Sequence, residues 1–381
     1  MRDLPGTTWV AGFRTAVISP YEEIKLAAPR GFNGQTVRQV LRMAGGGERL
    51  RVRLSNRYGR DPLEIGSARV AVRESEDEIV PGSDTGLRFS GAAQVTVPAG
   101  GDVVSDPVEM PVKAGVELAL SLYLPGETGL ATYSHQPMQT AFVADGDLTS
   151  APGLPQAERV QARFYVTGVD VLAPEGTAIA VAFGDSWFEG FGTTVDADHR
   201  SVDALNERLD QGWVVNQGIG GNRLLIDEIG EHALARFDRD VLGVPGATHV
   251  LVHFGINDLG LPGMVGRPPA TAEELIDGFT ELSRRAHEAG LAVLGATIGP
   301  FAGVIYPGIS TPEGLAARRR VNEWIRTGDA FDAVFDVARA VGDPANPDFI
   351  RPEFDSGDGM HFNDAGARAM AESVDLRTLP L

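Results

Sequence analysis

Ala178-Ile179-Ala180-Val181-Ala182-Phe183 is a continuous apolar run in this sequence, and Gly184-Asp185-Ser186 follows it directly. A short run without polar interruption is typical of a β-strand that is covered on both faces. Two similar runs occupy residues 250–254 and 291–294. The three runs predict buried, parallel strands in the second half of the chain.

Helical segments separate these runs. Thr271 and Glu274 have the spacing of a capping box, and apolar residues recur at helical spacing from Leu275 until Gly290. Strands that alternate with helices form parallel sheets with helices packed on them. We therefore predict an α/β fold for residues 173–381: a three-layer α/β/α domain with a parallel, flavodoxin-like sheet.

Residues 1–172 carry a different pattern. In Arg49-Leu50-Arg51-Val52-Arg53-Leu54, charged and apolar side chains alternate, as in a strand with one face toward water. Similar alternation recurs at 69–73, 94–97 and 116–122, with glycine-rich breakers between the stretches. This predicts a β-sandwich accessory domain of jelly-roll-like form, although periodicity alone does not separate a jelly roll from an immunoglobulin-like sandwich. Ala173-Pro174 marks the expected boundary.

Composition narrows the classes of partner. Among the 381 residues, 33 are Lys or Arg and 52 are Asp or Glu, which gives a formal net charge of −19. This charge repels phosphates, so we expect no nucleic-acid partner. The absence of Cys excludes disulfides and thiol nucleophiles.

No apolar run reaches the length of about 18 residues that a membrane span needs. Residues 1–6 lack the apolar segment of an export signal, so we expect a cytoplasmic protein as written, or a secreted one if the N-terminus has been trimmed.

Three polar motifs lie where apolar runs end. They are Gly184-Asp185-Ser186, the glycine-rich stretch 218–222, and Gly255-Ile256-Asn257-Asp258. Ligands of parallel sheets bind beyond the carboxyl ends of the strands. We therefore expect a serine hydroxyl, a glycine turn and an asparagine amide at one edge of the sheet.

A fourth motif, Asp358-Gly359-Met360-His361, lies near the C-terminus and precedes a helix expected from Asn363. A histidine three residues after an aspartate can take an orienting hydrogen bond from the same turn and act as a general base. Two other histidines, His249 and His253, lie in an apolar strand, and His287 lies in a helix.

In this order, the four motifs resemble the SGNH (GDSL-type) hydrolase superfamily over residues 178–373. The resemblance implies that Ser186 is the nucleophile, His361 the base and Asp358 its partner. It also implies an oxyanion hole formed by the Ser186 backbone N–H with Gly221 and Asn257.

The implied activity is hydrolysis of carboxylic esters through an acyl-enzyme, without a cofactor or a metal. Similarity to bacterial two-domain members with an N-terminal β domain favours, for this chain, a short acyl group such as acetyl on a carbohydrate or small metabolite. The substrate would thus be a small-molecule or saccharide ester, and the sequence leaves the oligomeric state open.

Other functions remain open at this point. The same acyl-enzyme would serve an acyltransferase if an alcohol replaced water, and loss of turnover would leave a glycan-binding protein. A metal hydrolase would need His249 and His253 as two of its ligands, but their apolar neighbours favour a packing role. An α/β-hydrolase would need Gly-x-Ser-x-Gly, which residues 184–188 do not match.

Trp187 departs from the family pattern, which usually has a smaller aliphatic residue after the serine. It is either a stacking surface that binds substrate or a packing residue under the nucleophile loop. Asp185 is expected to cap the helix that follows it.

Overall fold

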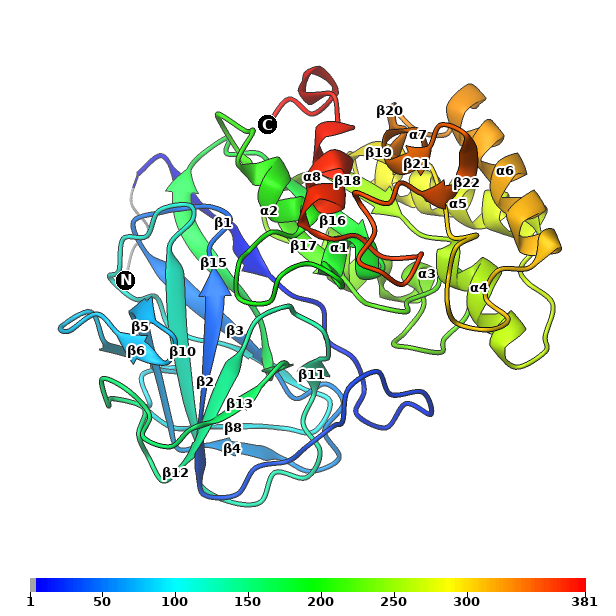
Figure 1. The fold of residues 1–381 in the computed structure, drawn as a ribbon. Helices are drawn as coiled ribbons and strands as arrows, with labels where there is room; N and C mark the ends of the chain where they lie inside the picture. The colour runs from blue at the N-terminus through cyan, green and yellow to red at the C-terminus, as the bar shows by residue number, and fades with distance from the viewer. Residues whose placement is uncertain (1–4) are drawn as a thin grey trace. The chain divides into compact units, whose positions relative to one another are not determined.

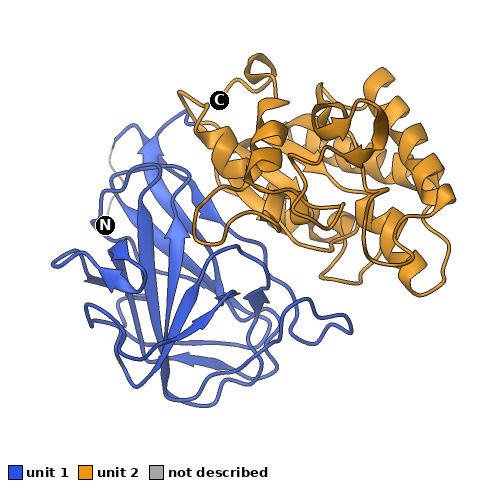
Figure 2. Cartoon of the chain, in the orientation of Figure 1, with its two compact units in different colours: residues 1–177 blue, residues 178–381 orange. Residues whose placement is uncertain are grey.

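The computed structural model describes residues 5–381, which form two compact units (Figures 1 and 2). Unit 1 is Met1–Thr177 and unit 2 is Ala178–Leu381. Residues 1–4, which carry part of the N-terminal stretch discussed above, lie outside the described residues. The boundary expected at 172/173 falls within a strand, because β15 (Val166–Pro174) pairs with β1 (Thr7–Arg14) as far as Pro174.

Unit 1 is rich in β-strands. Its four-stranded sheet has the order β1-β15-β3-β9, and its seven-stranded sheet has the order β13-β12-β2-β10-β5-β6, with β7 paired to β5. Two short sheets pair β4 with β8 and β11 with β14. The remaining strands are β2 (Gln35–Arg42), β3 (Leu50–Ser55), β4 (Leu63–Ile65), β5 (Ser67–Ser75), β6 (Glu78–Ile79), β7 (Thr85–Gly86), β8 (Val95–Val97), β9 (Asp102–Val104), β10 (Glu117–Leu124), β11 (Tyr133–Ser134), β12 (Ala141–Asp145), β13 (Glu158–Val160) and β14 (Arg163–Phe164).

Strand β3 shows why the alternating pattern of this unit folds as it does. Leu50, Val52 and Leu54 are buried, whereas Arg51 and Arg53 between them stay partly exposed. Successive side chains of a strand point to opposite faces, so one face of β3 joins the core and the other carries the arginines. The strand expected at 49–54 is confirmed.

A buried carboxylate organises the arginine-bearing face. Asp170 of β15 is fully buried and accepts hydrogen bonds from Arg14, Arg51 and Arg53. Burial alone would raise the pKa of Asp170, but the hydrogen bond from Arg53 and the charge of Arg14 lower it to about 2. One anion therefore joins three strands, β1, β15 and β3.

Unit 2 is an α/β domain with a five-stranded parallel sheet, as expected in outline. The strand order is β17-β16-β18-β19-β20, which is 2-1-3-4-5 when counted within the unit. The strands are β16 (Ile179–Gly184), β17 (Trp213–Gly218), β18 (Ala247–His253), β19 (Ala292–Ala296) and β20 (Ala333–Phe335), and a two-stranded sheet pairs β21 (Gly342–Asp343) with β22 (Asn346–Ile350).

Helices follow most of these strands (Figure 1). They are α1 (Ser186–Glu189), α2 (Ser201–Asn206), α3 (Ala233–Phe237), α4 (Ile256–Met264), α5 (Ala272–Glu288), α6 (Pro312–Thr327), α7 (Val337–Val341) and α8 (Asp364–Glu372), with a π-helical turn at Asp238–Leu242 and a 3-10 turn at Leu376–Thr378. The capping box of Thr271 and Glu274 at the start of α5 is confirmed. No helix among residues 5–381 is long and apolar enough to cross a membrane.

Three strands of this sheet end at the same level. The register pairs Gly184, the last residue of β16, with Gly218 of β17 on one side and His253 of β18 on the other. A Cβ atom at Gly184 would lie 2.6 Å from the carbonyl oxygen of His253, and one at Gly218 would lie 2.3 Å from the amide nitrogen of Glu189. Glycine at these two positions therefore lets the end of β16 approach β18 and the end of β17 approach α1.

We predict that Asp170→Asn lowers the free energy of unfolding by about 3–5 kcal/mol, because it leaves the buried Arg14 beside two other cations without an anion. Urea unfolding at pH 7 measures the loss. Arg51→Gln is the matched control: its side chain is 27% exposed, so about 1 kcal/mol or less should be lost. Equal losses in the two variants would contradict a central role for Asp170.

Candidate active site

Ser186 is the first residue of α1, directly after the end of β16. Asp185 is the N-cap, and its carboxylate accepts a hydrogen bond of 3.1 Å from the Trp187 backbone N–H. The expected helix cap is therefore confirmed. The sharp change from strand to helix at Gly184-Asp185 presents the Ser186 side chain at the carboxyl edge of the sheet.

His361 and Asp358 meet this serine from the other end of the chain. His361 Nε2 lies 3.0 Å from Ser186 Oγ, and His361 Nδ1 lies 2.6 Å from Asp358 Oδ2. The Asp358 carboxylate also accepts the backbone N–H groups of Met360 and His361, at 2.9 and 2.8 Å. The structure thus joins Ser186, His361 and Asp358 by direct hydrogen bonds.

The environment of Asp358 favours its ionised form. Burial alone would raise the pKa of Asp358, but the hydrogen bond and charge of His361, together with the backbone N–H groups, outweigh burial and hold that pKa well below its usual range. A carboxylate that stays charged fixes the orientation of the imidazole ring and stabilises the imidazolium when a proton arrives.

Two residues near this group were not found from the sequence. The Tyr306 hydroxyl donates to Asp358 Oδ2 at 3.3 Å, and the Phe191 ring packs edge-on against His361, with 4.6 Å between ring centroids. Burial and the adjacent Asp358 charge raise the pKa of Tyr306, so its phenol keeps the proton that it donates. Neither residue has a local sequence signal, because each contact joins segments that lie far apart in the chain.

The glycine turn and α4 supply the remaining candidates. Gly221 has a φ of +78°, which is accessible to glycine at little cost. Asn257 lies in the first turn of α4 and donates from Nδ2 to the Asn222 carbonyl at 2.9 Å, which leaves its second amide hydrogen for another acceptor. Gly221 follows β17 and Asn257 follows β18, and both strands end level with β16, which precedes Ser186.

Comparison with protein families shows which family this domain belongs to. Residues 182–369 match the model of the GDSL-like Lipase/Acylhydrolase family. Unit 2 carries a GDSL-like lipase/acylhydrolase domain. The family expected from the four motifs is confirmed, and the match identifies the protein as a carboxylic ester hydrolase. No curated protein sequence matches the chain.

The GDSL-like domain also resembles solved structures at low sequence identity. The native aryl esterase of M. smegmatis is 17% identical, with 54% of this chain and 99% of that chain covered and a TM-score of 0.44. A carbohydrate acetylesterase from Sinorhizobium meliloti is 16% identical, with coverage of 53% and 99% and a TM-score of 0.42. A GDSL-like lipase from Bacteroides thetaiotaomicron VPI-5482 is 14% identical, with coverage of 54% and 89% and a TM-score of 0.42.

Trp187 of the GDSL-like domain is buried. Its indole is 2% exposed, stacks on His253 and contacts Phe362, and its Nε1 donates to the Met360 carbonyl at 3.0 Å. This burial favours packing beside Ser186 over a stacking surface for substrate, and a substrate-binding role for Trp187 stays an untested prediction.

The two strand histidines have separate partners. His253 Nδ1 lies 3.0 Å from Asp185 Oδ1, whereas His249 Nδ1 lies 2.8 Å from the Thr248 hydroxyl. Within residues 5–381, no three His, Asp or Glu side chains gather in a way that could hold a metal ion. His253 instead pairs with Asp185, the N-cap residue of α1.

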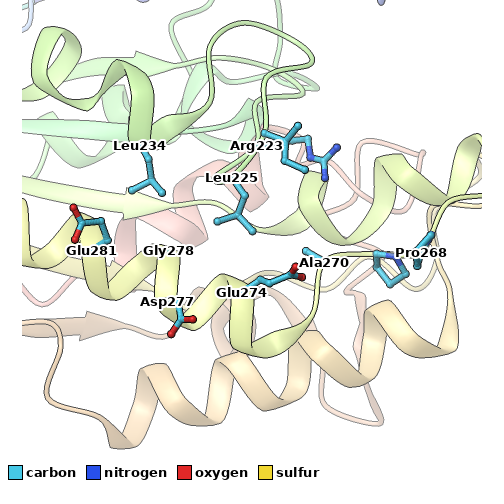
Figure 3. A pocket seen from close by; sticks show the side chains of 11 residues that line it. Arg223, Leu225, Leu234, Pro268, Ala270, Glu274, Asp277, Gly278 and Glu281 are labelled. Carbon is cyan, nitrogen blue, oxygen red and sulfur yellow. The ribbon is translucent and has the colours of Figure 1, made fainter.

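A pocket of about 620 Å³ adjoins the segment that follows the glycine turn (Figure 3). Leu225 and Leu234 lie on one side of it, and Glu274, Asp277 and Glu281 lie on the other side, on α5. Its lining also includes Arg223, Ile226, Pro268, Pro269, Ala270 and Gly278.

Asp258 holds this segment in place. The Asp258 carboxylate is fully buried and accepts the backbone N–H groups of Leu224 and Leu225, at 2.9 and 3.2 Å. Burial raises the pKa of Asp258 to about 6, against the lowering effect of these hydrogen bonds and of Arg223. Asp258 therefore anchors the segment that follows Gly221, a role with no signal in the local sequence.

We predict that Asp258 makes the protein more stable as the pH falls from 7 to 5. A group whose pKa is higher in the folded state than in the unfolded chain binds protons more tightly when folded, so its contribution is present at low pH and is lost as the pH rises through about 6. The free energy of unfolding of the wild type, relative to Asp258→Asn, should rise by about 1.3 kcal/mol between pH 7 and pH 5. Urea unfolding at the two pH values measures this difference, and a constant difference would show that Asp258 does not titrate in this range.

Proposed function

We propose that Ser186, His361 and Asp358 form a catalytic triad that hydrolyses carboxylic esters through an acyl-enzyme. The observation that supports this most directly is the continuous chain of hydrogen bonds from Asp358 through His361 to Ser186. A serine hydroxyl is a weak nucleophile unless a neighbouring base takes its proton, and His361 Nε2 is within reach of that proton.

In the first half of the reaction, Ser186 Oγ attacks the ester carbonyl carbon while His361 Nε2 takes the hydroxyl proton. The carbonyl oxygen becomes an oxyanion, which would be stabilised by the backbone N–H groups of Ser186 and Gly221 and by the Asn257 amide. The bond to the alcohol oxygen then breaks, and His361 returns its proton to that oxygen. The alcohol leaves, and the acyl group stays on Ser186.

In the second half, water attacks the acyl carbon. His361 takes a proton from this water, the tetrahedral intermediate forms in the same oxyanion hole, and Ser186 leaves as its oxygen recovers the proton from His361. The products are a carboxylic acid and the free enzyme. The sequence of steps needs no cofactor, and an alcohol in place of water would make an acyltransferase.

The acyl group that this site accepts is proposed to be short, such as acetyl, on a carbohydrate or small metabolite. Ser186 is 3% exposed and His361 is 8% exposed, which leaves little open surface around the reacting atoms. A small acyl group requires the least space beside them. We expect acetyl esters to be cleaved faster than long-chain esters.

We further propose that the whole molecule pairs a β-sandwich of jelly-roll type with a flavodoxin-like, three-layer catalytic domain. The proposal for unit 1 is supported by two large sheets that each bury leucine-rich strands, such as β3 and β10. The strand order 2-1-3-4-5 in unit 2 is that of flavodoxin-like sheets. All five proposed triad and oxyanion residues belong to unit 2.

We predict that Ser186→Ala and His361→Ala each lower kcat for 4-nitrophenyl acetate by about 10⁴-fold or more, since the members of a triad act as a unit. His287→Ala is a matched control because His287 also pairs with an aspartate, Asp332, at 2.9 Å. Ser283→Ala is the control for a buried serine hydroxyl. Both controls should keep kcat within about twofold of the wild type. Near-normal turnover in either triad variant would refute the proposed site.

We predict that log(kcat/KM) rises with a slope of one on the acid side of the pH profile. The pKa of Asp358 lies well below its usual range, so this carboxylate stays ionised and adds no second ionisation to the profile. A single general base, which must be unprotonated to accept the serine proton, then gives a slope of one. Hydrolysis rates between pH 4.5 and 8 measure the slope. A slope near two would mean that a second group, such as Asp358, loses its proton in the same range.

A further inference from the structure

A buried arginine connects the strand ends that carry the proposed site. Arg236 lies in α3, and its guanidinium is fully buried. Nη2 donates to the Gly184 carbonyl at 3.0 Å, Nη1 donates to the Gln217 carbonyl at 2.9 Å, and Nε donates to Asn222 Oδ1 at 3.0 Å. One rigid group therefore contacts the ends of β16 and β17 and the turn that follows β17.

Two of these three acceptors lie within two residues of a residue of the proposed site. Gly184 is two residues before Ser186, and Asn222 directly follows Gly221. The side-chain oxygen of Asn222 accepts from Arg236, and its carbonyl accepts from Asn257. Its side-chain amide also donates to the carbonyls of Ile229 and Glu231. The guanidinium thus sets the spacing between the segment that carries the Ser186 N–H and the segment that carries the Gly221 N–H.

The chemistry of arginine suits this task. Its guanidinium is planar and presents its donors in a fixed fork, so it fixes angles as well as distances between its acceptors. A buried charge is costly to desolvate, and a hydrophobic side chain of similar volume often gives equal or better stability. Here the charge is offset by Asp240, whose carboxylate lies 3.0 Å from Nη1, and by the face of the Phe183 ring at 4.2 Å.

We propose that Arg236 is a positioning residue of ester hydrolysis: it holds the Ser186 and Gly221 backbone N–H groups at the separation that the oxyanion requires. Arg236 does not contact the substrate or the reacting atoms. It acts through the carbonyls of Gly184 and Gln217 and the side chain of Asn222. This inference rests on the proposed function, because it assigns a task within the same oxyanion hole.

The test compares Arg236→Lys with the wild type in the full chain. Lysine keeps the positive charge but has a single nitrogen, which cannot bind all of the acceptors in their fixed geometry. With 4-nitrophenyl acetate, kcat should fall by about tenfold or more while KM changes by less than about threefold, since small misplacements of catalytic groups lower kcat strongly.

The inhibition constant of a transition-state analogue distinguishes positioning of the oxyanion hole from a purely structural role. A simple alkylboronic acid adds to a serine hydroxyl and places a negatively charged tetrahedral group at the oxyanion hole. Its inhibition constant in Arg236→Lys should rise by about the same factor as kcat/KM falls. A falling kcat with an unchanged inhibition constant would contradict positioning of the oxyanion hole.

Arg318→Lys is the matched control. Arg318 is also buried in unit 2 and donates to two backbone carbonyls, those of Ile298 and Gly299, but these lie after β19, which carries no proposed site residue. Its loss should lower the melting temperature by an amount similar to Arg236→Lys, with kcat within about threefold of the wild type. Equal losses of kcat in both variants would overturn the proposal.

A second variant keeps the proposal testable if Arg236→Lys does not fold. Asn222→Ser removes the acceptor on the turn, together with the amide that donates to the Ile229 and Glu231 carbonyls, and leaves Arg236 bound to the Gly184 and Gln217 carbonyls. It should also lower kcat and weaken boronic-acid inhibition. Wild-type kcat in a folded Arg236→Lys or Asn222→Ser protein would refute the inference. Failure of the proposed function gives a different result, because Ser186→Ala would then retain activity.

Discussion

The close approach of three parallel strand ends is the constraint on which the rest of the site depends. Gly184 pairs with Gly218 and with His253, and a side chain at Gly184 or Gly218 would collide with the neighbouring backbone. Because these strands stop level with one another, the segments that follow them leave the sheet at one edge. Ser186 and the glycine turn start there, and α4 with Asn257 starts beside them.

Buried charges around this edge hold the segments in fixed relation. Asp258 ties the loop after Gly221 to α4, and Asp358 orients His361. Each carboxylate loses favourable hydration on burial, which shifts the pKa of Asp258 upward, whereas the hydrogen bonds to Asp358 reverse that shift. Burial therefore raises the pKa of Asp258, whereas its hydrogen-bond partners lower the pKa of Asp358 despite burial.

Local signals made much of this protein predictable from its sequence. Apolar runs predicted the buried strands β16 and β18, and alternation predicted β3. Thr271 with Glu274 predicted the start of α5. The four motifs were recognisable because each lies within a few consecutive residues, and the match over residues 182–369 confirms the family that they indicated.

Contacts between distant segments could not be predicted in this way. Tyr306 reaches Asp358 across 52 residues, and Arg236 reaches Gly184 across the same number. Such pairs depend on how the strands and helices pack, and no periodicity or spacing in the chain encodes them. The burial of Trp187 was left open for the same reason, since it depends on His253 and Phe362.

We propose that Ser186 is a nucleophile activated by His361, and mapping a covalent adduct tests this proposal most directly. The full-length protein is treated with a fluorophosphonate, digested, and analysed by peptide mass spectrometry, with His361→Ala treated in parallel. We expect one adduct per chain, on Ser186, that forms as esterase activity is lost and forms far more slowly in His361→Ala. An adduct on another residue, or full inactivation with Ser186 unmodified, would contradict the proposed triad.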